Sequence, residues 1–280
     1  MRTRTLSAAV YVAVFVAALA RGGWAWAGLV AAIAAVGTLE LYHLARAGGR
    51  WPTLAVGAAM APAMALAIAA GSDAHGAPMP WPGAVLALGV IAAFVAQIAR
   101  PADRRALDDW AVTLAAPVYL GGLLGHLIAL RGLPDGHGLA WSALALALVW
   151  GNDSAAYLGG RAFGRRPFFP SLSPRKTVEG GLAGLAASVG IGWAAPALAG
   201  AVGGGLAPLA GVSPLATAGV GLVVGVVGPA GDLAESFLKR QVGAKDSGGW
   251  IPGHGGILDR VDSIAFAAPV LYYVASWLTA

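Results

Sequence analysis

Apolar segments of about 20 residues, separated by short polar stretches, repeat along the whole of this chain. A helix that crosses the hydrocarbon core of a membrane needs roughly 20 predominantly apolar residues. The chain of 280 residues is 58% hydrophobic and only 11% charged, so it has too little polar surface to cover a water-soluble globule of its size. The sequence therefore predicts an all-α integral membrane protein, built as a polytopic bundle.

About nine candidate transmembrane helices can be drawn by this length criterion. Gly and Ala are frequent within them, which is typical of membrane helices that pack closely through small residues. The candidate spans cover residues 6–20, 24–45, 53–71, 83–99, 110–130, 138–158, 178–200, 212–232 and 257–279.

The distribution of positive charge predicts how these helices are oriented. Cytoplasmic loops of membrane proteins carry an excess of Lys and Arg. If the N-terminus is cytoplasmic and the chain crosses the membrane at every candidate span, all of the 18 Lys and Arg residues except Arg21 and Arg131 fall on the cytoplasmic side. We therefore expect a multi-pass protein of the cell (inner) membrane whose charged loops face the cytoplasm. The net charge of +5 is then explained by membrane orientation, and we expect no nucleic-acid partner.

Two stripes of polar side chains flank a glycine-rich basic loop near the end of the chain, at the i, i+3 and i+4 spacing of one helix face. Mg²⁺ takes carboxylate oxygens and shares its remaining positions with water and substrate phosphates. Carboxylates in spanning segments are costly and indicate function. We therefore predict that Asp232 and Asp259 bind a metal, with Asp262 and Asp246 nearby. The first stripe comprises Asp232, Glu235, Ser236 and Lys239, and the second comprises Asp259, Asp262 and Ser263.

Two questions about this region stay open at the level of sequence. The acids could instead form salt bridges, Asp232 with Lys239 or Asp259 with Arg260. His254 lies in a Pro-Gly-His-Gly-Gly loop without an apolar helix face around it, so it either binds phosphate or stabilises the loop.

A second polar region, residues 151–180, follows the sixth candidate span. Asp153 would lie at the C-terminal end of a helix, the negative pole of the helix dipole, where a carboxylate needs a counter-charge. Arginines and glycines follow, and a helix N-terminus that can receive phosphate begins near residue 177. A loop that only binds anionic lipid headgroups is the alternative, but it has no need of Asn152 and Asp153. The predicted substrate-binding residues here are Asn152, Asp153, Tyr157, Arg161, Ser173, Arg175, Lys176 and Thr177.

The chain before residue 131 is chemically quiet. Only Glu40 and His43 stand out, near the cytoplasmic end of the second candidate span, and we expect them to snorkel or pair rather than react. We interpret residues 1–130 as a scaffold of helices that offers surface for dimer contacts, and residues 131–280 as the catalytic region. The chain has no cysteine, which excludes thiolate catalysis and Cys-based metal sites.

Two groups of residues, at these spacings, resemble the characteristic regions of one enzyme family. The first group is Ser236, Lys239-Arg240, Lys245-Asp246, Gly248, Ile251-Pro252, His254-Gly255-Gly256, Asp259-Arg260 and Asp262. The second is Asp153 to Tyr157, Gly160-Arg161, Phe163-Gly164, Ser173-Pro174, Lys176-Thr177 and Glu179-Gly180. Together they are similar to the phosphatidate cytidylyltransferases, also called CDP-diacylglycerol synthases. The resemblance covers residues 150–263 and does not extend to specific residues of the N-terminal half.

The resemblance implies a Mg²⁺-dependent reaction of CTP with phosphatidate that gives CDP-diacylglycerol and pyrophosphate. The reaction would take place at the cytoplasmic face of the membrane, in contact with membrane lipids. It also implies a homodimer and a second, monovalent cation such as K⁺. On the chemistry of this reaction we assign catalytic roles to Asp232, Lys239, Asp246, Asp259 and Arg260, and metal binding to Asp232, Asp259 and Asp262. Further substrate-binding residues are Ser236, Arg240, Lys245, His254, Gly255 and Gly256.

The residue types also suit this chemistry independently of the resemblance. The attacking lipid phosphate is already ionised at neutral pH, so the enzyme must chiefly overcome repulsion between two phosphates, which cations and a metal do. The alternatives are another CTP-dependent lipid enzyme, either an ether-lipid cytidylyltransferase or a polyprenol kinase, and an anion transporter. A transporter is less favoured because the charges cluster at one face and in the C-terminal half, whereas transport sites lie near the bilayer midplane.

Overall fold

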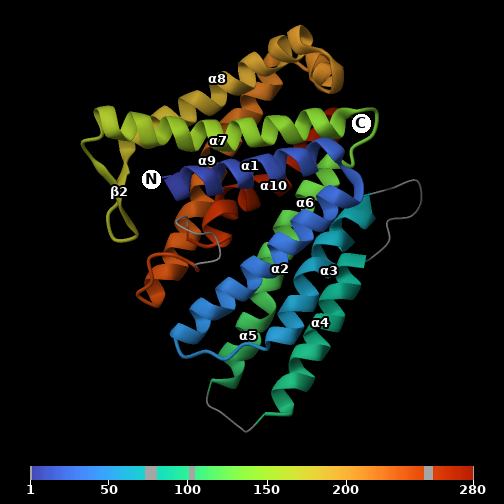
Figure 1. Cartoon of the computed structure of the whole chain (residues 1–280), viewed down its shortest axis with the longest axis vertical. Coiled ribbons are helices and arrows are strands. Elements are labelled where there is room, and N and C mark those ends of the chain that lie inside the picture. The colour runs from blue at the N-terminus through green and yellow to red at the C-terminus, as the bar shows by residue number, and fades with distance from the viewer. Residues whose placement is uncertain (1, 73–80, 101–104, 249–254, 280) are drawn as a thin grey trace. The chain divides into compact units, whose positions relative to one another are not determined.

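The computed structural model of the protein describes residues 2–72, 81–100, 105–248 and 255–279 (Figure 1). Most of this part of the chain is helical, and each predicted span lies largely within helices. The α-helices are α1 (Arg2–Arg21), α2 (Gly23–Ala47), α3 (Leu54–Ser72), α4 (Trp81–Ile98), α5 (Ala106–Pro117), α6 (Leu123–Arg131), α7 (His137–Phe163), α8 (Val178–Val202), α9 (Pro214–Gln241) and α10 (Leu258–Thr279).

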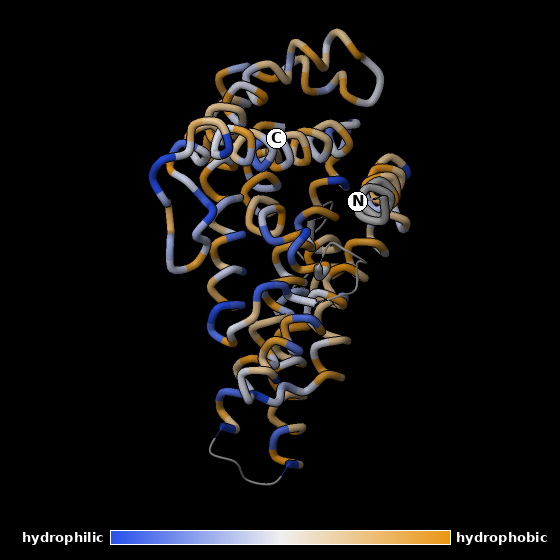
Figure 2. Tube along the Cα trace, turned by 60° about the vertical axis from the view of Figure 1, so that its left-hand side comes forward, coloured by the Kyte–Doolittle hydropathy of each residue, from blue (hydrophilic) through white to orange (hydrophobic). Residues whose placement is uncertain are grey.

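Among the described residues, six helical stretches are long and apolar enough to cross a membrane. They correspond to α2, α4, the run from α5 to α6, α8, α9 and α10. The other three predicted spans form α1, α3 and α7, of which α1 and α3 contain shorter apolar helices. Orange apolar residues dominate the helices in Figure 2, and blue hydrophilic residues gather near helix ends and connections. The expectation of a multi-pass, all-α membrane protein is confirmed at this level.

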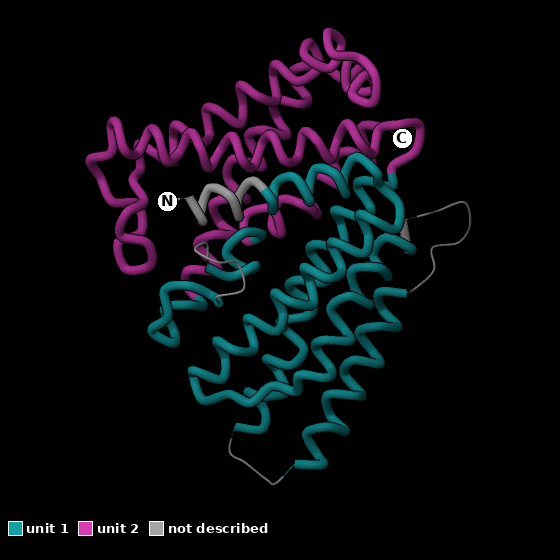
Figure 3. Tube along the Cα trace, in the orientation of Figure 1, with its two compact units in different colours: residues 1–132, 238–261 teal, residues 133–237, 262–280 magenta. Residues whose placement is uncertain are grey.

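The structure divides into two compact units (Figure 3). Unit 1 comprises residues 1–132 and 238–261, and unit 2 comprises residues 133–237 and 262–280. The segment that contains the glycine-rich loop therefore groups with the N-terminal helices, although we assigned it to the catalytic region beginning at residue 131.

In unit 1, α2, α3, α4 and α5 lie side by side (Figure 1). Between α5 and α6 the helix widens into a π-helical turn, Val118–Gly122, directly after Pro117, which has no N–H to donate. Glycine allows α3 to approach this turn closely, because a Cβ on Gly121 would lie 2.3 Å from the carbonyl oxygen of Ala61. The buried Tyr42 hydroxyl on α2 donates to the carbonyl of Thr113 on α5 at 2.6 Å and ties these helices together.

In unit 2, α8 packs along α7 and, through glycines, against α9. A Cβ on Gly192 would lie 2.2 Å from the backbone carbonyl oxygen of Thr217, and one on Gly221 would lie 2.2 Å from that of Ser188. The predicted close packing of helices through small residues is therefore present here.

Two short strands, β1 (Pro167–Phe169) and β2 (Ser173–Thr177), form an antiparallel ribbon between α7 and α8. Pro167 lies opposite Thr177, and Phe169 lies opposite Ser173. The sequence predicted only a flexible basic loop here, because a strand of three residues is too short to show an alternating pattern. The ribbon matters for the site because it carries Arg175 and Lys176 on a defined backbone.

Candidate functional site

A pocket of about 580 Å³ in unit 2 brings together much of the second polar region. Its walls are α7, the two-stranded ribbon, the start of α8 and the polar part of α9. Both charge types face it, together with apolar groups such as Phe168 and Leu233. Its charged lining residues are Asp153 and Arg161 on α7, Arg175 and Lys176 on β2, and Asp232 on α9.

The ion pair between Lys176 and Asp232 joins the ribbon to α9. The Nζ atom of Lys176 lies 2.5 Å from Oδ2 of Asp232, and both side chains remain about one-third exposed, at 29% and 33%. The other carboxylate oxygen of Asp232 accepts a long hydrogen bond of 3.4 Å from the Ser236 hydroxyl, one helical turn further along α9. The salt-bridge alternative considered from the sequence named Lys239 as the partner of Asp232; the partner found is Lys176, from a different element.

The N-terminus of α8 forms one edge of the pocket. Thr177 ends β2, and its hydroxyl accepts a hydrogen bond from the Gly180 amide at 3.2 Å, which caps the helix. Glycines at positions 180 and 181 line the pocket without side chains. The partial positive charge of a helix N-terminus therefore faces this space, as the sequence indicated.

Asn152 serves helix packing as well as the pocket. Its side chain is 2% exposed, and its Nδ2 donates to the Ser188 hydroxyl at 3.1 Å and to the Gly225 carbonyl at 3.3 Å. These bonds tie α7 to α8 and α9, so Asn152 holds the three helices that form the pocket. Tyr157 lines the same pocket and is exposed, and Ser173 lies at the start of β2.

The acids of unit 2 fit a magnesium site in their chemistry. Asp262 lies within electrostatic range of both Asp232 and Asp153 and accepts a hydrogen bond from the Ser263 amide at 2.6 Å. Among the described residues, no group of three or more His, Asp or Glu side chains has the arrangement of a complete metal site. Mg²⁺ needs only one or two protein carboxylates where substrate phosphates and water supply the rest, so the donor set is sufficient.

The segment around Asp259 belongs to unit 1 and makes a separate, dense cluster. Oδ1 of Asp259 accepts from Lys239 Nζ at 2.5 Å. Oδ2 accepts from the Gly256 amide at 2.9 Å and from both the amide and the hydroxyl of Ser247 at 3.0 Å. The two acids of the predicted metal pair, Asp232 and Asp259, therefore lie in different units, each beside a lysine of its own unit.

Four of the remaining predicted residues are exposed, namely Arg240, Lys245, Asp246 and Arg260. Arg240 donates to the Ala244 carbonyl at 3.1 Å. Gly255 has a φ of 79°, a conformation that favours glycine. His254 lies outside the described residues.

Sequence reasoning did not find the partners of Glu40. Of the two expectations, snorkelling is wrong because the side chain is 1% exposed; it pairs instead, accepting hydrogen bonds from Ser247, Ile257 and Leu258. The available signal was an acid within an apolar span, which indicates function by itself. Its partners could not be found from the sequence, because Ser247 lies 207 residues further along the chain.

Comparisons with known proteins point to one family. The family model described as "Cytidylyltransferase family" matches residues 2–278. The chain is 40% identical over 158 residues to a phosphatidate cytidylyltransferase of Brucella suis biovar 1, covering 56% of this chain and 55% of that protein. It is 39% identical over 163 residues to the phosphatidate cytidylyltransferase of Bacillus subtilis, covering 58% and 56% of the two chains.

A third relative aligns over nearly its whole length. This phosphatidate cytidylyltransferase of Synechocystis is 31% identical over 306 residues, covering 96% of this chain and 94% of its own. The first two matches, by contrast, span about half the length of those relatives. Because the family model matches almost the entire sequence, the chain belongs to the cytidylyltransferase family.

Proposed function

We propose that the protein is a phosphatidate cytidylyltransferase, which joins CTP and phosphatidate to form CDP-diacylglycerol and pyrophosphate. The observation that carries this proposal is the pocket of unit 2, where Lys176 and Asp232 pair beside two arginines, a second acid (Asp153) and the N-terminus of α8. Cations suit phosphates, carboxylates suit a divalent metal, and the apolar lining suits a lipid. Relatives that are named phosphatidate cytidylyltransferases support the choice of substrates.

The reaction makes one bond and breaks one. An ionised oxygen of the lipid phosphate attacks the α-phosphorus of CTP, and the bond from that phosphorus to the bridging oxygen of pyrophosphate breaks. The electron pair leaves with pyrophosphate, and no strong base is required. Arg161, Arg175 and Lys176 would reduce the repulsion between lipid phosphate and triphosphate and align the attack. The N-terminus of α8 would stabilise negative charge at the same edge of the pocket.

Mg²⁺ is proposed to be held by Asp232 and Asp262, with Asp153 nearby, because these acids share one unit and one charged region. When bound, the ion would neutralise charge that develops on the phosphate oxygens. Ser236 would orient the carboxylate of Asp232. A metal role for Asp259 also stays a prediction, and it would require that carboxylate to exchange part of its present hydrogen bonding.

The membrane topology, the location of the protein and its assembly as a homodimer are also part of this proposal. We infer a multi-pass protein of the inner membrane with a cytoplasmic N-terminus, nine spans and a site that faces the cytoplasm, since this orientation gathers the basic residues on one side. A homodimer and a monovalent cation such as K⁺ are implied by the family alone. Lys239, Arg240, Lys245 and Arg260 remain predicted to hold substrate phosphates, and Asp246 remains a predicted catalytic acid near the metal.

One assay separates the proposed activity from its alternatives. Purified protein is incubated with Mg²⁺, CTP labelled at the α-phosphate, and phosphatidate in mixed micelles, and lipid extracts are examined for a labelled CDP-lipid. Parallel reactions replace phosphatidate with an ether-lipid phosphate, or use γ-labelled CTP with a polyprenol. We expect labelled CDP-diacylglycerol. Preferential use of the ether lipid, phosphorylation of the polyprenol, or no labelled lipid at all would refute the assignment to phosphatidate.

A further inference from the structure

We propose that Glu40 is a positioning residue for the reaction: it holds the start of α10 from a different helix and thereby orients Asp259. This inference rests on the proposed function, because the importance of Asp259 comes from its predicted catalytic role. It assigns a role in the reaction to the helices before residue 131, which were otherwise interpreted as a scaffold.

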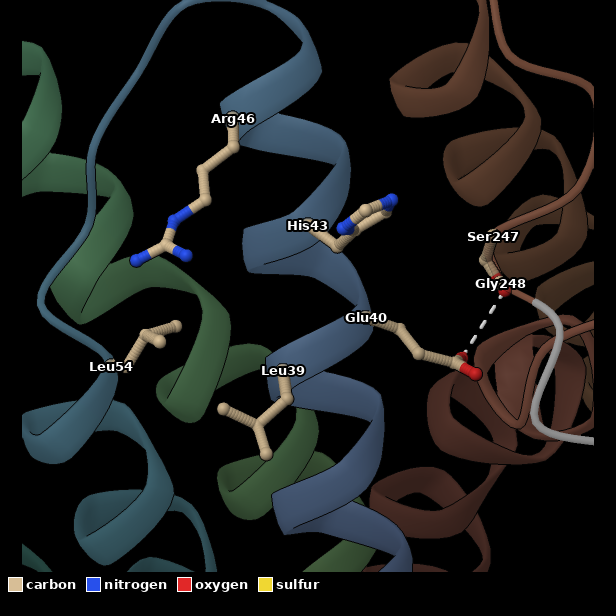
Figure 4. A pocket seen from close by; sticks show the side chains of 7 residues that line it. All are labelled: Leu39, Glu40, His43, Arg46, Leu54, Ser247 and Gly248. Atoms are coloured by element: carbon tan, nitrogen blue, oxygen red, sulfur yellow. Dashed lines mark hydrogen bonds between the residues drawn. The ribbon is translucent and has the colours of Figure 1, made fainter.

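The carboxylate of Glu40 binds three donors of one segment. Oε1 accepts from the Ile257 amide at 2.9 Å. Oε2 accepts from the Leu258 amide at 2.8 Å and faces the Ser247 hydroxyl at 3.2 Å. Figure 4 shows Glu40 extending from α2 toward Ser247, while Arg46 points to the other side of the helix. Glu40 is 1% exposed, and an acid so buried is tolerated only where such partners stabilise its charge.

The start of α10 needs a cap from elsewhere. The first amides of a helix lack intrahelical acceptors, and a local Ser, Thr, Asp or Asn usually supplies an oxygen. Here the helix begins at Leu258 and follows Gly255 and Gly256, which have no side chain to offer. Glu40 satisfies these amides instead, and its negative charge lies at the positive end of the helix dipole.

The glycines make room for this carboxylate. A Cβ on Gly256 would lie 2.0 Å from the Ser247 hydroxyl oxygen and 2.5 Å from Oε2 of Glu40. A Cβ on Gly248 would lie 2.7 Å from Oε1 of Glu40. Both sides of the loop are therefore built to approach Glu40 more closely than any other residue type would allow.

Ser247 connects Glu40 to Asp259. Its hydroxyl lies 3.2 Å from Glu40 Oε2 and 3.0 Å from Asp259 Oδ2. A hydroxyl has one proton, so it donates to one carboxylate at a time, and it lies within hydrogen-bond distance of both acids. Asp259 also accepts from the Gly256 amide, next to the amides that Glu40 binds. Moving Glu40 would therefore move the backbone that orients Asp259.

Glu40→Gln is the sharpest substitution because it keeps size and removes one acceptor. The amide NH₂ that replaces an oxygen would face a donor, either a backbone N–H or the Ser247 hydroxyl. Glu40→Asp retains both oxygens but withdraws them by one methylene group. Asp109→Asn is the matched control, since Asp109 is also a buried acid of unit 1 that accepts from a backbone amide, that of Trp51 at 2.6 Å.

The test uses the full-length protein in lipid nanodiscs, with two measurements on each variant. Hydrogen exchange of peptides covering residues 244–248 and 255–262 reports how well the backbone amides of these segments are protected. Steady-state cytidylyl transfer, at a temperature where every variant is folded, gives kcat and KM for CTP. For Glu40→Gln we expect faster exchange confined to these peptides and a fall in kcat of about 10–100-fold, the usual effect of losing an outer-shell partner. Asp109→Asn should change neither readout.

The outcomes separate this inference from the proposed function. Unchanged exchange and kcat in folded Glu40→Gln would overturn it, as would an equal loss of kcat in Asp109→Asn, which would show general destabilisation. If Glu40→Gln does not fold, Glu40→Asp carries the same test. If the wild-type protein makes no CDP-lipid, the proposed function fails, and normal exchange in the Glu40 variants would then also overturn the positioning role.

Discussion

Lys176 Nζ lies 2.5 Å from Asp232 Oδ2, and this ion pair links β2 to α9 across the pocket of unit 2. A pair whose side chains are 29% and 33% exposed contributes little to folding, because solvent screens it and the lysine side chain loses conformational freedom. Its value is better explained by function. Under the proposed function, Lys176 would bind a phosphate and Asp232 would bind a metal ion in this pocket.

The first prediction separates function from stability at this pair. We expect Asp232→Asn to lower the rate of cytidylyl transfer by about 10²-fold or more, the usual effect of removing one preorganised electrostatic group. Its unfolding free energy should change by less than about 1 kcal/mol, since the ion pair is partly exposed. Initial rates and thermal unfolding of the purified variant measure the two effects.

Asp135→Asn is the control for this substitution. Asp135 is an exposed acid of the same unit, in the turn before α7, and its φ of 54° suits Asn. Its activity should equal that of the wild-type protein. Near-normal, Mg²⁺-dependent turnover by Asp232→Asn would contradict the proposed metal role.

The second prediction concerns metal removal. EDTA should abolish transfer, and added Mg²⁺ should restore it, because the acids of unit 2 supply hard oxygen donors beside the proposed phosphate site. Asp262→Asn should raise the Mg²⁺ concentration for half-maximal rate by about tenfold. Rates titrated with Mg²⁺ provide the measurement. Full turnover in excess EDTA, or an Asp262→Asn titration identical to that of the wild-type protein, would disprove the assignment.

Local features of the fold could be predicted from the sequence. The apolar runs predicted the helices, and the helix N-terminus predicted near residue 177 is where α8 begins. These signals depend on neighbours within one or two turns, so a single sequence contains them. The ribbon of β1 and β2 was not predicted, because two strands this short are defined by their pairing with each other.

Long-range partners of the polar residues could not be predicted. The salt-bridge alternative considered from the sequence paired Asp232 with Lys239 on the same helix face, whereas the structure pairs Asp232 with Lys176 and Lys239 with Asp259. Helical spacing brings residues onto one face but does not say which other element that face meets. The same limit hid the contact of Glu40 with Ile257, 217 residues further along the chain.

The third prediction tests the proposed orientation. The chain lacks cysteine, so single cysteines can be labelled with a membrane-impermeant maleimide in intact cells. Arg165→Cys should react only after permeabilisation, and Ala207→Cys should react from outside, because the two positions flank α8. Position 207 is chosen over the nearby Gly205 because residue 207 is exposed, whereas a Cβ on Gly205 would lie 2.6 Å from a Leu139 side-chain atom. The cysteine-free parent is the control, and labelling of both positions from one side would contradict the proposed topology.

The fourth prediction compares Gly219 and Gly221 of α9, which are two residues apart and therefore lie on roughly opposite sides of the helix. A Cβ on Gly221 would lie 2.2 Å from the Ser188 carbonyl oxygen of α8, whereas one on Gly219 would meet nothing within 4 Å. We expect Gly221→Ala to force α8 and α9 apart and to destabilise the protein by about 1–3 kcal/mol, as overpacking does. Gly219→Ala should be neutral or stabilising by up to about 1 kcal/mol, because Ala favours helix. Thermal unfolding in detergent compares them, and equal melting temperatures would show that α8 and α9 do not approach through Gly221.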